Sequence, residues 1–287
     1  MAAQVASFFH APTNTWSHIV SDTATCIAAV IDPVLDFEPA SCRVSNEHAQ
    51  VLLTHVREHG LRVEWILETH AHADHLSAAD WLKRALPHAQ TGIGAGIVAV
   101  QKHFAKVFAF GAEFRADGAQ FDHLFIADEV FRLGELEARV IATPGHTSDG
   151  VSYWIDDAVF VGDTLFSPDG GTGRCDFPGA DAATQYRSIQ RLYALPDATR
   201  VFLCHDYPES RAPTAQTTIG AEKAGNLQLN AATREADYIA LRQRRDATLS
   251  APRLLYPSLQ VNICAGQLPP SDVTGRLQLR SPATTPG

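Results

Sequence analysis

The sequence predicts a layered α/β fold formed by a single domain over residues 1–287. The first observation is that short, β-branched apolar runs alternate with longer segments of helical periodicity in both halves of the chain. The second is that clusters of histidine and aspartate directly follow several of these apolar runs. In layered α/β folds the loops at strand ends converge on one rim, where ligands bind. Fold class and site position are therefore predicted by the same pattern.

Four elements are predicted in the first half of the chain. Apolar runs that stop at proline or at polar residues predict strands, and a polar-faced segment closed by glycine predicts a helix. Ser77 followed by Asp80 three residues later resembles a capping box, so a further helix is expected there. The expected elements are a strand at 25–31, a helix at 45–59, a strand at 62–70 and a helix at about 78–86.

The second half repeats the mixture of strands and helices and ends in an extension. The extension is expected to cover about 210–270, and the tail after it, 271–287, is expected to be flexible. The expected strands are 138–146, 150–156, 158–163, 199–206 and the run VNICAG at 261–266; the expected helices are 181–195 and two between 217 and about 247.

The composition argues against several classes of protein. Hydrophobic residues make up 45% of the chain, charged residues make up 19%, and the formal net charge is −9. A nucleic-acid-binding surface is therefore not expected. No apolar run is long enough to span a membrane, and the opening residues lack the pattern of a signal peptide. The 5 cysteines have no CxxC spacing, which is typical of reduced thiols, so a cytoplasmic location is expected.

The stretch ETHAHADH at 68–75 is the strongest chemical signal in the chain. It places His70, His72, Asp74 and His75 between an apolar run and a predicted helix. Residues two apart in an extended segment project to the same side, so His70 and His72 can point at one centre. Imidazole and carboxylate groups together suit zinc, iron, manganese or nickel. A metal site is favoured over a polar loop that happens to be rich in histidine.

Three further segments offer ligands at predicted strand ends. His146 follows Pro-Gly, Asp163 ends an apolar run, and His205 and Asp206 end another. Taken alone, each would be an ordinary turn or capping residue. Because one metal takes ligands from several segments, the cluster at 68–75 makes these residues joint candidates.

Four short motifs in this order, THAHADH, PGHT, GDTLF and CHDY, resemble the metallo-β-lactamase superfamily. The resemblance implies an αβ/βα sandwich, with two mixed β-sheets flanked by helices and a metal in the groove between the sheets. The stretches 161–193 and 257–270 further resemble the persulfide dioxygenases, in particular their bacterial β-lactamase-hydrolase-like branch. That family oxidises glutathione persulfide with O₂ to sulfite and glutathione, using one non-haem Fe(II).

Carried over residue by residue, the resemblance implies that His70, His146 and Asp163 hold the iron. Such a 2-His-1-carboxylate set leaves one face open for the substrate sulfur and O₂. The resemblance implies that the remaining donors of the motifs do not bind the iron themselves. They either orient the iron ligands through hydrogen bonds or are remnants of a second metal site. These donors are His72, Asp74, His75 and His205.

The same resemblance assigns the substrate-binding residues. Arg174 lies near the substrate in the family, and its planar fork suits a carboxylate of glutathione; a structural arginine that pins the glycine-rich loop is the alternative. Tyr207 is expected to act catalytically, with its hydroxyl reaching the substrate or the iron-bound ligand. Arg211 is expected to be a second cation, although the segment 208–216 departs from the family pattern. A homodimer is expected from the family.

A dinuclear zinc hydrolase of thioesters or lactones, like glyoxalase II, remains the alternative. In such an enzyme two zinc ions lower the pKa of a bridging water, which then attacks a carbonyl group. The spacing of the ligands does not distinguish the two reactions, and only the family resemblance favours the dioxygenase. The two zinc sites would be His70, His72 and His146, and Asp74, His75 and His205, with Asp163 as the bridge.

Overall fold

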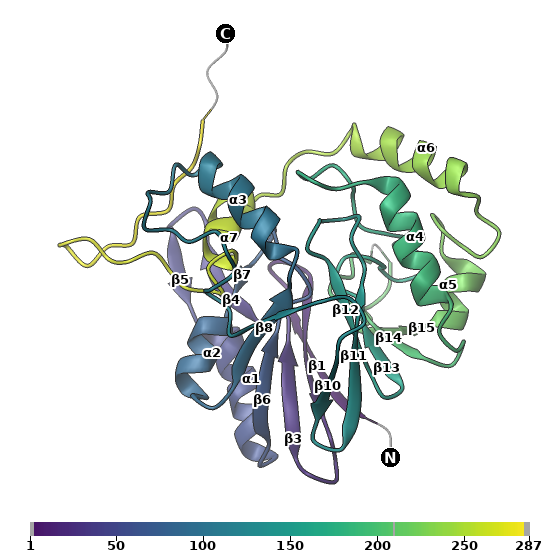
Figure 1. Ribbon diagram of the computed structural model, residues 1–287, viewed down its shortest axis with the longest axis horizontal. Coiled ribbons are helices and arrows are strands. Elements are labelled where there is room, and N and C mark those ends of the chain that lie inside the picture. Colours follow the sequence, from purple (N-terminus) through teal and green to yellow (C-terminus); the bar gives the residue numbers. More distant parts are fainter. Residues whose placement is uncertain (1–2, 209, 284–287) are drawn as a thin grey trace.

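The computed structural model describes residues 3–208 and 210–283. Two six-stranded sheets pack face to face, and helices cover their outer faces (Figure 1). This is the αβ/βα sandwich with two mixed sheets that the sequence resemblance implied, and that prediction is confirmed. No helix in the described ranges is long and apolar enough to cross a membrane.

The first sheet has the strand order β1-β2-β3-β6-β8-β9. Its first three strands pair antiparallel, and β3, β6, β8 and β9 pair parallel. Helices α1 and α2 pack their apolar side chains on its outer face, and a small three-stranded sheet, β5-β4-β7, lies beside it. The bounds are β1 Gln4–His10, β2 Thr15–Ser21, β3 Ile27–Ile31, β4 Val34–Glu38, β5 Arg43–Ser45, α1 Glu47–Glu58, β6 Arg62–Leu67, β7 Leu76–Ser77, α2 Ala79–Ala85, β8 Gln90–Gly94, α3 Ile97–Val107 and β9 His123–Phe125.

The second sheet has the order β10-β11-β12-β13-β14-β15, and only its β13–β14 pair is parallel. A parallel pair needs a crossover, which here contains α4. Apolar side chains from α4, α5 and α6 cover the outer face of this sheet. The bounds are β10 Val130–Leu133, β11 Leu136–Ala142, β12 Val151–Ile155, β13 Ala158–Phe160, α4 Ala182–Tyr193, β14 Arg200–Phe202, β15 Gln216–Thr218, α5 Ile219–Gly225, α6 Glu235–Asp246 and α7 Leu255–Asn262.

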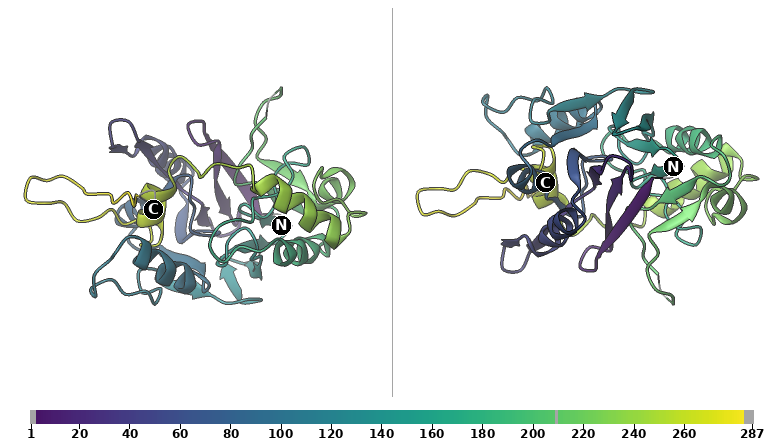
Figure 2. Two further views of the ribbon diagram at one scale, coloured as in Figure 1. Left: turned by 90° about the horizontal axis from the view of Figure 1, so that it is seen from above. Right: turned by 90° about the horizontal axis from the view of Figure 1, so that it is seen from below.

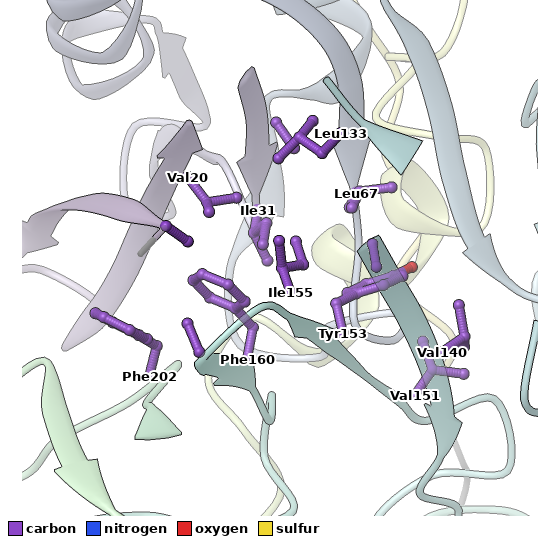
Figure 3. Close-up of a cluster of buried hydrophobic side chains, with 14 of the residues drawn as sticks. Val20, Ile31, Leu67, Leu133, Val140, Val151, Tyr153, Ile155, Phe160 and Phe202 are labelled. Atoms are coloured by element: carbon purple, nitrogen blue, oxygen red, sulfur yellow. The ribbon is translucent and has the colours of Figure 1, made fainter. Parts of the chain in front are cut away.

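The core between the sheets is formed by their inward-facing side chains (Figure 3). Ile31 and Leu67 from the first sheet meet Ile155 and Phe160 from the second, and all four are almost completely buried. Burying a side chain of this size contributes roughly 1.5–3 kcal/mol. The Tyr153 hydroxyl donates a hydrogen bond of 2.9 Å to the carbonyl oxygen of Glu68, so its polar end is satisfied at the loop that carries the histidines.

The predicted strands at 25–31 and 62–70 and the predicted helix at 181–195 are confirmed as β3, β6 and α4. The prediction of a strand at VNICAG is wrong, because 255–262 is helix α7 and a turn follows it. Its apolar residues pack in two directions: Val261 contacts the layer of α1 and α2, and Leu259 contacts the layer of α3. A short apolar run does not distinguish a strand from a buried helix by its periodicity alone.

The capping box predicted from Ser77 and Asp80 does not form. Helix α2 begins after Ala78, and no side chain caps it. The Ser77 hydroxyl instead donates to the Glu68 carboxylate and accepts from the backbone N–H of Ala79 at 3.0 Å. The Ser77 hydroxyl therefore links the buried Glu68 carboxylate to the first residue of α2, and Asp80 pairs with Arg84.

The C-terminal extension at 210–270 contains β15 and helices α5 to α7. The segment after it forms a loop that projects away from the body (Figure 2). Further along, the backbone of Arg280 returns to α7, where its N–H donates to Gln260 at 2.7 Å and its carbonyl oxygen accepts from Gln260 at 2.6 Å. The flexibility expected for 271–287 stays a prediction, and 284–287 lie outside the described residues.

A buried carboxyl group in α5 makes stability depend on pH. Glu222 is fully buried, and burial raises its pKa to about 7, although Asn226 donates to one of its oxygens at 2.7 Å. Since the pKa in the folded state exceeds the ordinary value, the stabilisation is complete below about pH 4.5 and is lost as the pH rises to about 7. We expect the contribution of Glu222 to the free energy of unfolding to fall by about 3 kcal/mol over that pH range.

Glu222→Gln should flatten this part of the pH dependence, and above pH 7 the variant should be more stable than the parent. Urea unfolding between pH 5 and pH 8, at constant metal loading, measures the difference. Glu47→Gln, on the exposed face of α1, is the matched control. Equal slopes for Glu222→Gln and the parent would show that another group causes the pH dependence.

Candidate metal centre

The loop between β6 and β7, which carries the histidine cluster, is held by side chains from distant segments. Asn262, at the end of α7, donates hydrogen bonds to the carbonyl oxygens of His72 (2.7 Å) and His75 (2.8 Å). The same amide accepts from the N–H of Ser77 at 2.8 Å. From the loop after β11, Asp149 accepts from the N–H of Ala71 at 2.8 Å. The histidines therefore lie on a rigid loop, although it has no regular secondary structure.

Three of the predicted metal ligands meet at one point. His70, His146 and Asp163 come from the loops after β6, β11 and β13, and one ligand atom of each lies within 4.8 Å of the others. The Nε2 of His146 is 3.5 Å from Oδ2 of Asp163. All three side chains are buried.

The hydrogen bonds around this set leave metal-binding atoms free. The Nδ1–H of His146 donates to the carbonyl oxygen of Arg174 at 2.7 Å. The Nδ1–H of His70 donates to the Thr69 hydroxyl at 3.0 Å, which itself donates to Asp32 at 3.0 Å. Each ring therefore has its lone pair on Nε2. Burial, together with the neighbouring imidazoles, lowers the pKa of His70 far below its ordinary value, so this ring is neutral.

The unpartnered atoms indicate a cation. Nε2 of His70 and Oδ1 of Asp163 are buried and have no hydrogen-bond partner among the described residues. Buried polar atoms without partners are costly and rare. Two neutral imidazoles and a carboxylate are a donor set that suits a divalent transition metal. These residues therefore fit a bound metal ion, and the Thr69 and Arg174 contacts would fix the orientation of both rings.

A second group of donors lies beside the first. His72, His75, Cys204 and His205 have ligand atoms within 4.8 Å of one another. The Nδ1–H of His205 donates to the carbonyl oxygen of Asn14 at 3.1 Å, which leaves Nε2 free. That Nε2 lies 3.2 Å from Asp74 and 3.4 Å from Asp163. Three nitrogens of this second group also have no hydrogen-bond partner within the described ranges: Nδ1 of His72 and Nε2 of His75 and of His205. The same holds for Oδ2 of the neighbouring Asp74.

His72 is tied to two buried carboxylates. Its Nε2–H donates to Asp32 at 2.9 Å, and the same nitrogen is 3.4 Å from Glu68. Burial lowers the pKa of His72, but the two carboxylates outweigh it and hold the pKa well above the ordinary value. Burial raises the pKa of Glu68. His72 therefore lies in a charge-balanced cluster next to the three-residue set, not within it.

A cavity of about 410 Å³ lies over the three-residue set. His146 and Asp163 line it, together with Phe166, Phe177 and Tyr207. The Tyr207 ring stacks on His205, with centroids 5.7 Å apart and planes inclined by 13°. This volume is in the range of small-ligand sites. The predicted catalytic tyrosine is thus placed at the wall of the cavity, and its role stays a prediction.

Arg174 lines the cavity, but its guanidinium is already paired. Nε and Nη2 each donate to Asp176 at 2.6 Å, and Nη1 donates to the carbonyl oxygen of Ser250 at 2.7 Å. The side chain also lies over the ring of Phe177, 5.3 Å from its centroid. These contacts correspond to the alternative interpretation, an arginine that pins the glycine-rich loop.

Arg211, the expected second cation, does not line this cavity, and its role at the substrate stays a prediction. Its guanidinium donates to Asp206 at 2.8 Å and to Asp169 at 2.7 Å. Asp206 is buried beside His205 and Tyr207, and it also accepts from the N–H of Thr214 at 2.7 Å. The arginine therefore satisfies a buried carboxylate and fastens the loop after Tyr207.

Arg211→Ala should leave Asp206 without its cation. We expect a loss of about 1.5–3 kcal/mol in the free energy of unfolding, as for a hydrogen bond to a charged group. Arg139→Ala, which removes a half-exposed arginine with a weak 3.8 Å contact, is the control. If both variants have the unfolding free energy of the parent, Arg211 does not fasten the loop.

Several site residues were not identified from the sequence. Asp32 follows the first predicted strand, and this strand-end position is the only local signal for it. Asn262 carries no local signal, because its partners lie about 190 residues away in the chain. Arg245 and Arg253 line the cavity, but in sequence they resemble every other arginine of the extension.

The comparisons with known proteins agree with this geometry. A sequence profile of the metallo-β-lactamase superfamily matches residues 12–205. The chain is 44% identical to "Glyoxylase B2" of Dictyostelium discoideum, over 98% of this chain and 97% of that protein. It is 47% identical to the "Beta-lactamase hydrolase-like protein" of Agrobacterium fabrum, over 94% of this chain but only 62% of that longer protein.

Among solved structures, the "Crystal structure of ETHE1 from Myxococcus xanthus" superposes with a TM-score of 0.73 at 29% identity, covering 93% of this chain and 100% of that one. More distant relatives carry two different activities in their names. "Persulfide dioxygenase ETHE1, mitochondrial" of Homo sapiens is 29% identical over 75% of this chain and 78% of that protein. "Hydroxyacylglutathione hydrolase" of Methylococcus capsulatus is 33% identical over 78% of this chain and 76% of that protein.

Two buried histidines and a buried aspartate face one point in a two-sheet sandwich, and the superfamily profile matches most of the chain. The chain therefore belongs to the metallo-β-lactamase superfamily.

Proposed function

We propose that this protein is a glutathione persulfide dioxygenase with one ferrous ion per chain. The observation that carries the proposal is the composition of the three-residue set. His70, His146 and Asp163 come together without His72, which belongs to a neighbouring group. A 2-His-1-carboxylate set is typical of non-haem iron oxygenases and leaves one face open. The cavity lies on the side of His146 and Asp163.

The proposed overall reaction converts a persulfide, dioxygen and water into a thiol, sulfite and two protons. Both oxygen atoms of dioxygen and that of water go to the outer sulfur, which is oxidised, and the bond between the two sulfurs breaks. Bound ferrous iron would supply the electron-transfer chemistry that dioxygen needs to react with a thiolate. His70 and His146 would hold it through Nε2, with their Nδ1–H groups locked by Thr69 and Arg174.

The remaining residues of the cavity would bind and shield the substrate. The rings of Phe166 and Phe177 form apolar walls that exclude water from the sulfur. Tyr207, held by stacking on His205, presents a hydroxyl that can donate a hydrogen bond to the substrate. The similarity to structures and proteins named ETHE1 supports this assignment.

A dinuclear zinc hydrolase of glutathione thioesters is the second candidate. It is favoured by the second group of donors, since His75 and His205 present unpartnered nitrogens and Asp74 an unpartnered oxygen beside Asp163. The relatives named "Glyoxylase B2" and "Hydroxyacylglutathione hydrolase" support it as well. Both candidates act on derivatives of glutathione.

An oxygen-uptake assay distinguishes them. Protein loaded anaerobically with ferrous ion should consume O₂ when glutathione persulfide is added, and sulfite should appear in equal amount. S-lactoylglutathione should not be hydrolysed by the iron or the zinc form. No O₂ uptake, together with rapid thioester cleavage by the zinc form, would select the hydrolase.

The expected homodimer is tested separately, by light scattering of the protein as it elutes from a size-exclusion column.

His75→Leu addresses the number of metal ions. The dioxygenase proposal predicts one iron per chain in this variant and O₂ uptake within a few-fold of the parent, because His75 is outside the three-residue set. A dinuclear enzyme would lose its second ion and most of its activity. Leucine fills the buried position without a ligand atom, and His103→Leu on the exposed face of α3 controls for the substitution itself.

A further inference from the structure

Two arginines of the C-terminal extension lie at the cavity over the candidate metal centre. Arg245 is in the last turn of α6, and Arg253 is in the segment that leads to α7. Both line the cavity, and both are exposed. Within residues 3–208 and 210–283, neither guanidinium has a hydrogen bond or an ion pair. Both are contributed by the C-terminal extension.

The other two arginines of the cavity do not provide free charge. Arg174 is neutralised by its two hydrogen bonds with Asp176. Arg242 is buried and paired with Asp246, and it donates a further hydrogen bond of 2.7 Å to Gln228. The positive charge that a ligand in the cavity can use therefore comes from Arg245 and Arg253.

The lining of the cavity combines three kinds of side chain. His146 and Asp163 are buried, apolar side chains such as Phe177 and Leu249 also line the cavity, and Arg245 and Arg253 are exposed. A ligand that matches this lining has a metal-binding atom, an apolar part and an anionic group. A neutral thiol of the same length would leave both guanidinium groups without partners.

We propose that Arg245 and Arg253 form a carboxylate-recognition pair that selects thiol substrates bearing carboxylates, of which glutathione is the example, over neutral thiols. The inference rests on the proposed function for the position of the sulfur, and it holds for both candidate reactions because both use glutathione derivatives. Guanidinium groups bind carboxylates through two parallel hydrogen bonds. Because both arginines are exposed whereas the three-residue set is buried, we assign the pair to substrate binding, and KM is the parameter that it sets.

Kinetics with two forms of one substrate test the proposal. For glutathione persulfide, Arg245→Gln and Arg253→Gln should each raise KM about fivefold to tenfold, and the double variant by more, with kcat unchanged within twofold. For the persulfide of glutathione diethyl ester, which has no free carboxylate, the parent and the double variant should have the same KM. Arg244→Gln is the matched control, since Arg244 is exposed on the same helix and does not line the cavity.

Binding of glutathione itself separates this inference from the proposed reaction. Calorimetric titration should show weaker binding to the double variant than to the parent and to Arg244→Gln. Arginine-dependent binding in a protein that consumes no O₂ would reject the dioxygenase and leave the recognition pair intact. O₂ uptake with a KM that both variants leave unchanged would reject the pair. A fall in kcat alone would reject it as well, because that result would place the arginines in the chemical step.

Discussion

Asp163→Asn is expected to lose its metal and its activity together. The substitution keeps the shape of the side chain but removes the only carboxylate of the three-residue set. Losing a residue that merely orients a ligand typically costs 10–100-fold in metal affinity, and losing the ligand itself should cost more. We expect iron below about one tenth of an ion per chain and at least a hundredfold loss of O₂ uptake.

Metal content and unfolding temperature provide two independent measurements. A ligand that binds only the folded state raises stability, so a chelator should lower the unfolding temperature of the parent. It should have no effect on Asp163→Asn. Asp237→Asn, at a half-exposed position on α6, is the matched control and should behave like the parent. A variant with full iron content would show that Asp163 is not a ligand.

Asn262→Leu should have the second largest effect, although Asn262 is outside every sequence motif of the metal site. Its amide makes three hydrogen bonds of 2.7–2.8 Å to the loop that carries the histidines. Leucine leaves two carbonyl oxygens and one N–H buried without partners, at a cost of about 1–3 kcal/mol each. We expect a loss of at least about 3 kcal/mol in unfolding free energy and weaker binding of iron.

Asn262→Asp refines this test, because aspartate keeps the acceptor for Ser77 but cannot donate to the carbonyl oxygens of His72 and His75. It should therefore bind iron nearly as weakly as the leucine variant, even if it folds better. Asn46→Leu is the control, since the exposed side chain of Asn46 makes no capping hydrogen bond at the start of α1. Iron affinity equal to that of the parent in both Asn262 variants would show that α7 does not position the loop.

The agreement between prediction and structure is best where the signal is local. The strands at 27–31 and 62–67 and helix α4 follow from apolar periodicity and from the turn residues that end them. Where the outcome depended on a distant partner, prediction failed. Ser77 donates to Glu68 and accepts from Ala79 instead of forming the capping box with Asp80. The VNICAG run begins within helix α7, and its apolar side chains face two different layers.

The arginines show the same difference between what local sequence predicts and what distant partners decide. Sequence resemblance placed Arg174 and Arg211 at the substrate, yet both are bound to carboxylates of the protein, Asp176 and Asp206. Among the described residues, the cavity arginines without a hydrogen bond or ion pair are Arg245 and Arg253. Whether a guanidinium is available to a ligand depends on which carboxylate the fold brings beside it, and no local pattern reports that.

The sequence by itself determined the chemistry that this protein offers: imidazoles and carboxylates at the ends of buried strands, in an α/β sandwich. The family resemblance had already named His70, His146 and Asp163 as one set. The tertiary structure alone decided which ring nitrogens keep their lone pairs and which arginines at the cavity have no partner among the described residues. The physical reason is one of range. Strand and helix preferences act between near neighbours, whereas the hydrogen bonds that orient His70, His72 and His146 come partly from Asp32, Asn262 and the backbone of Arg174, which only folding brings into contact.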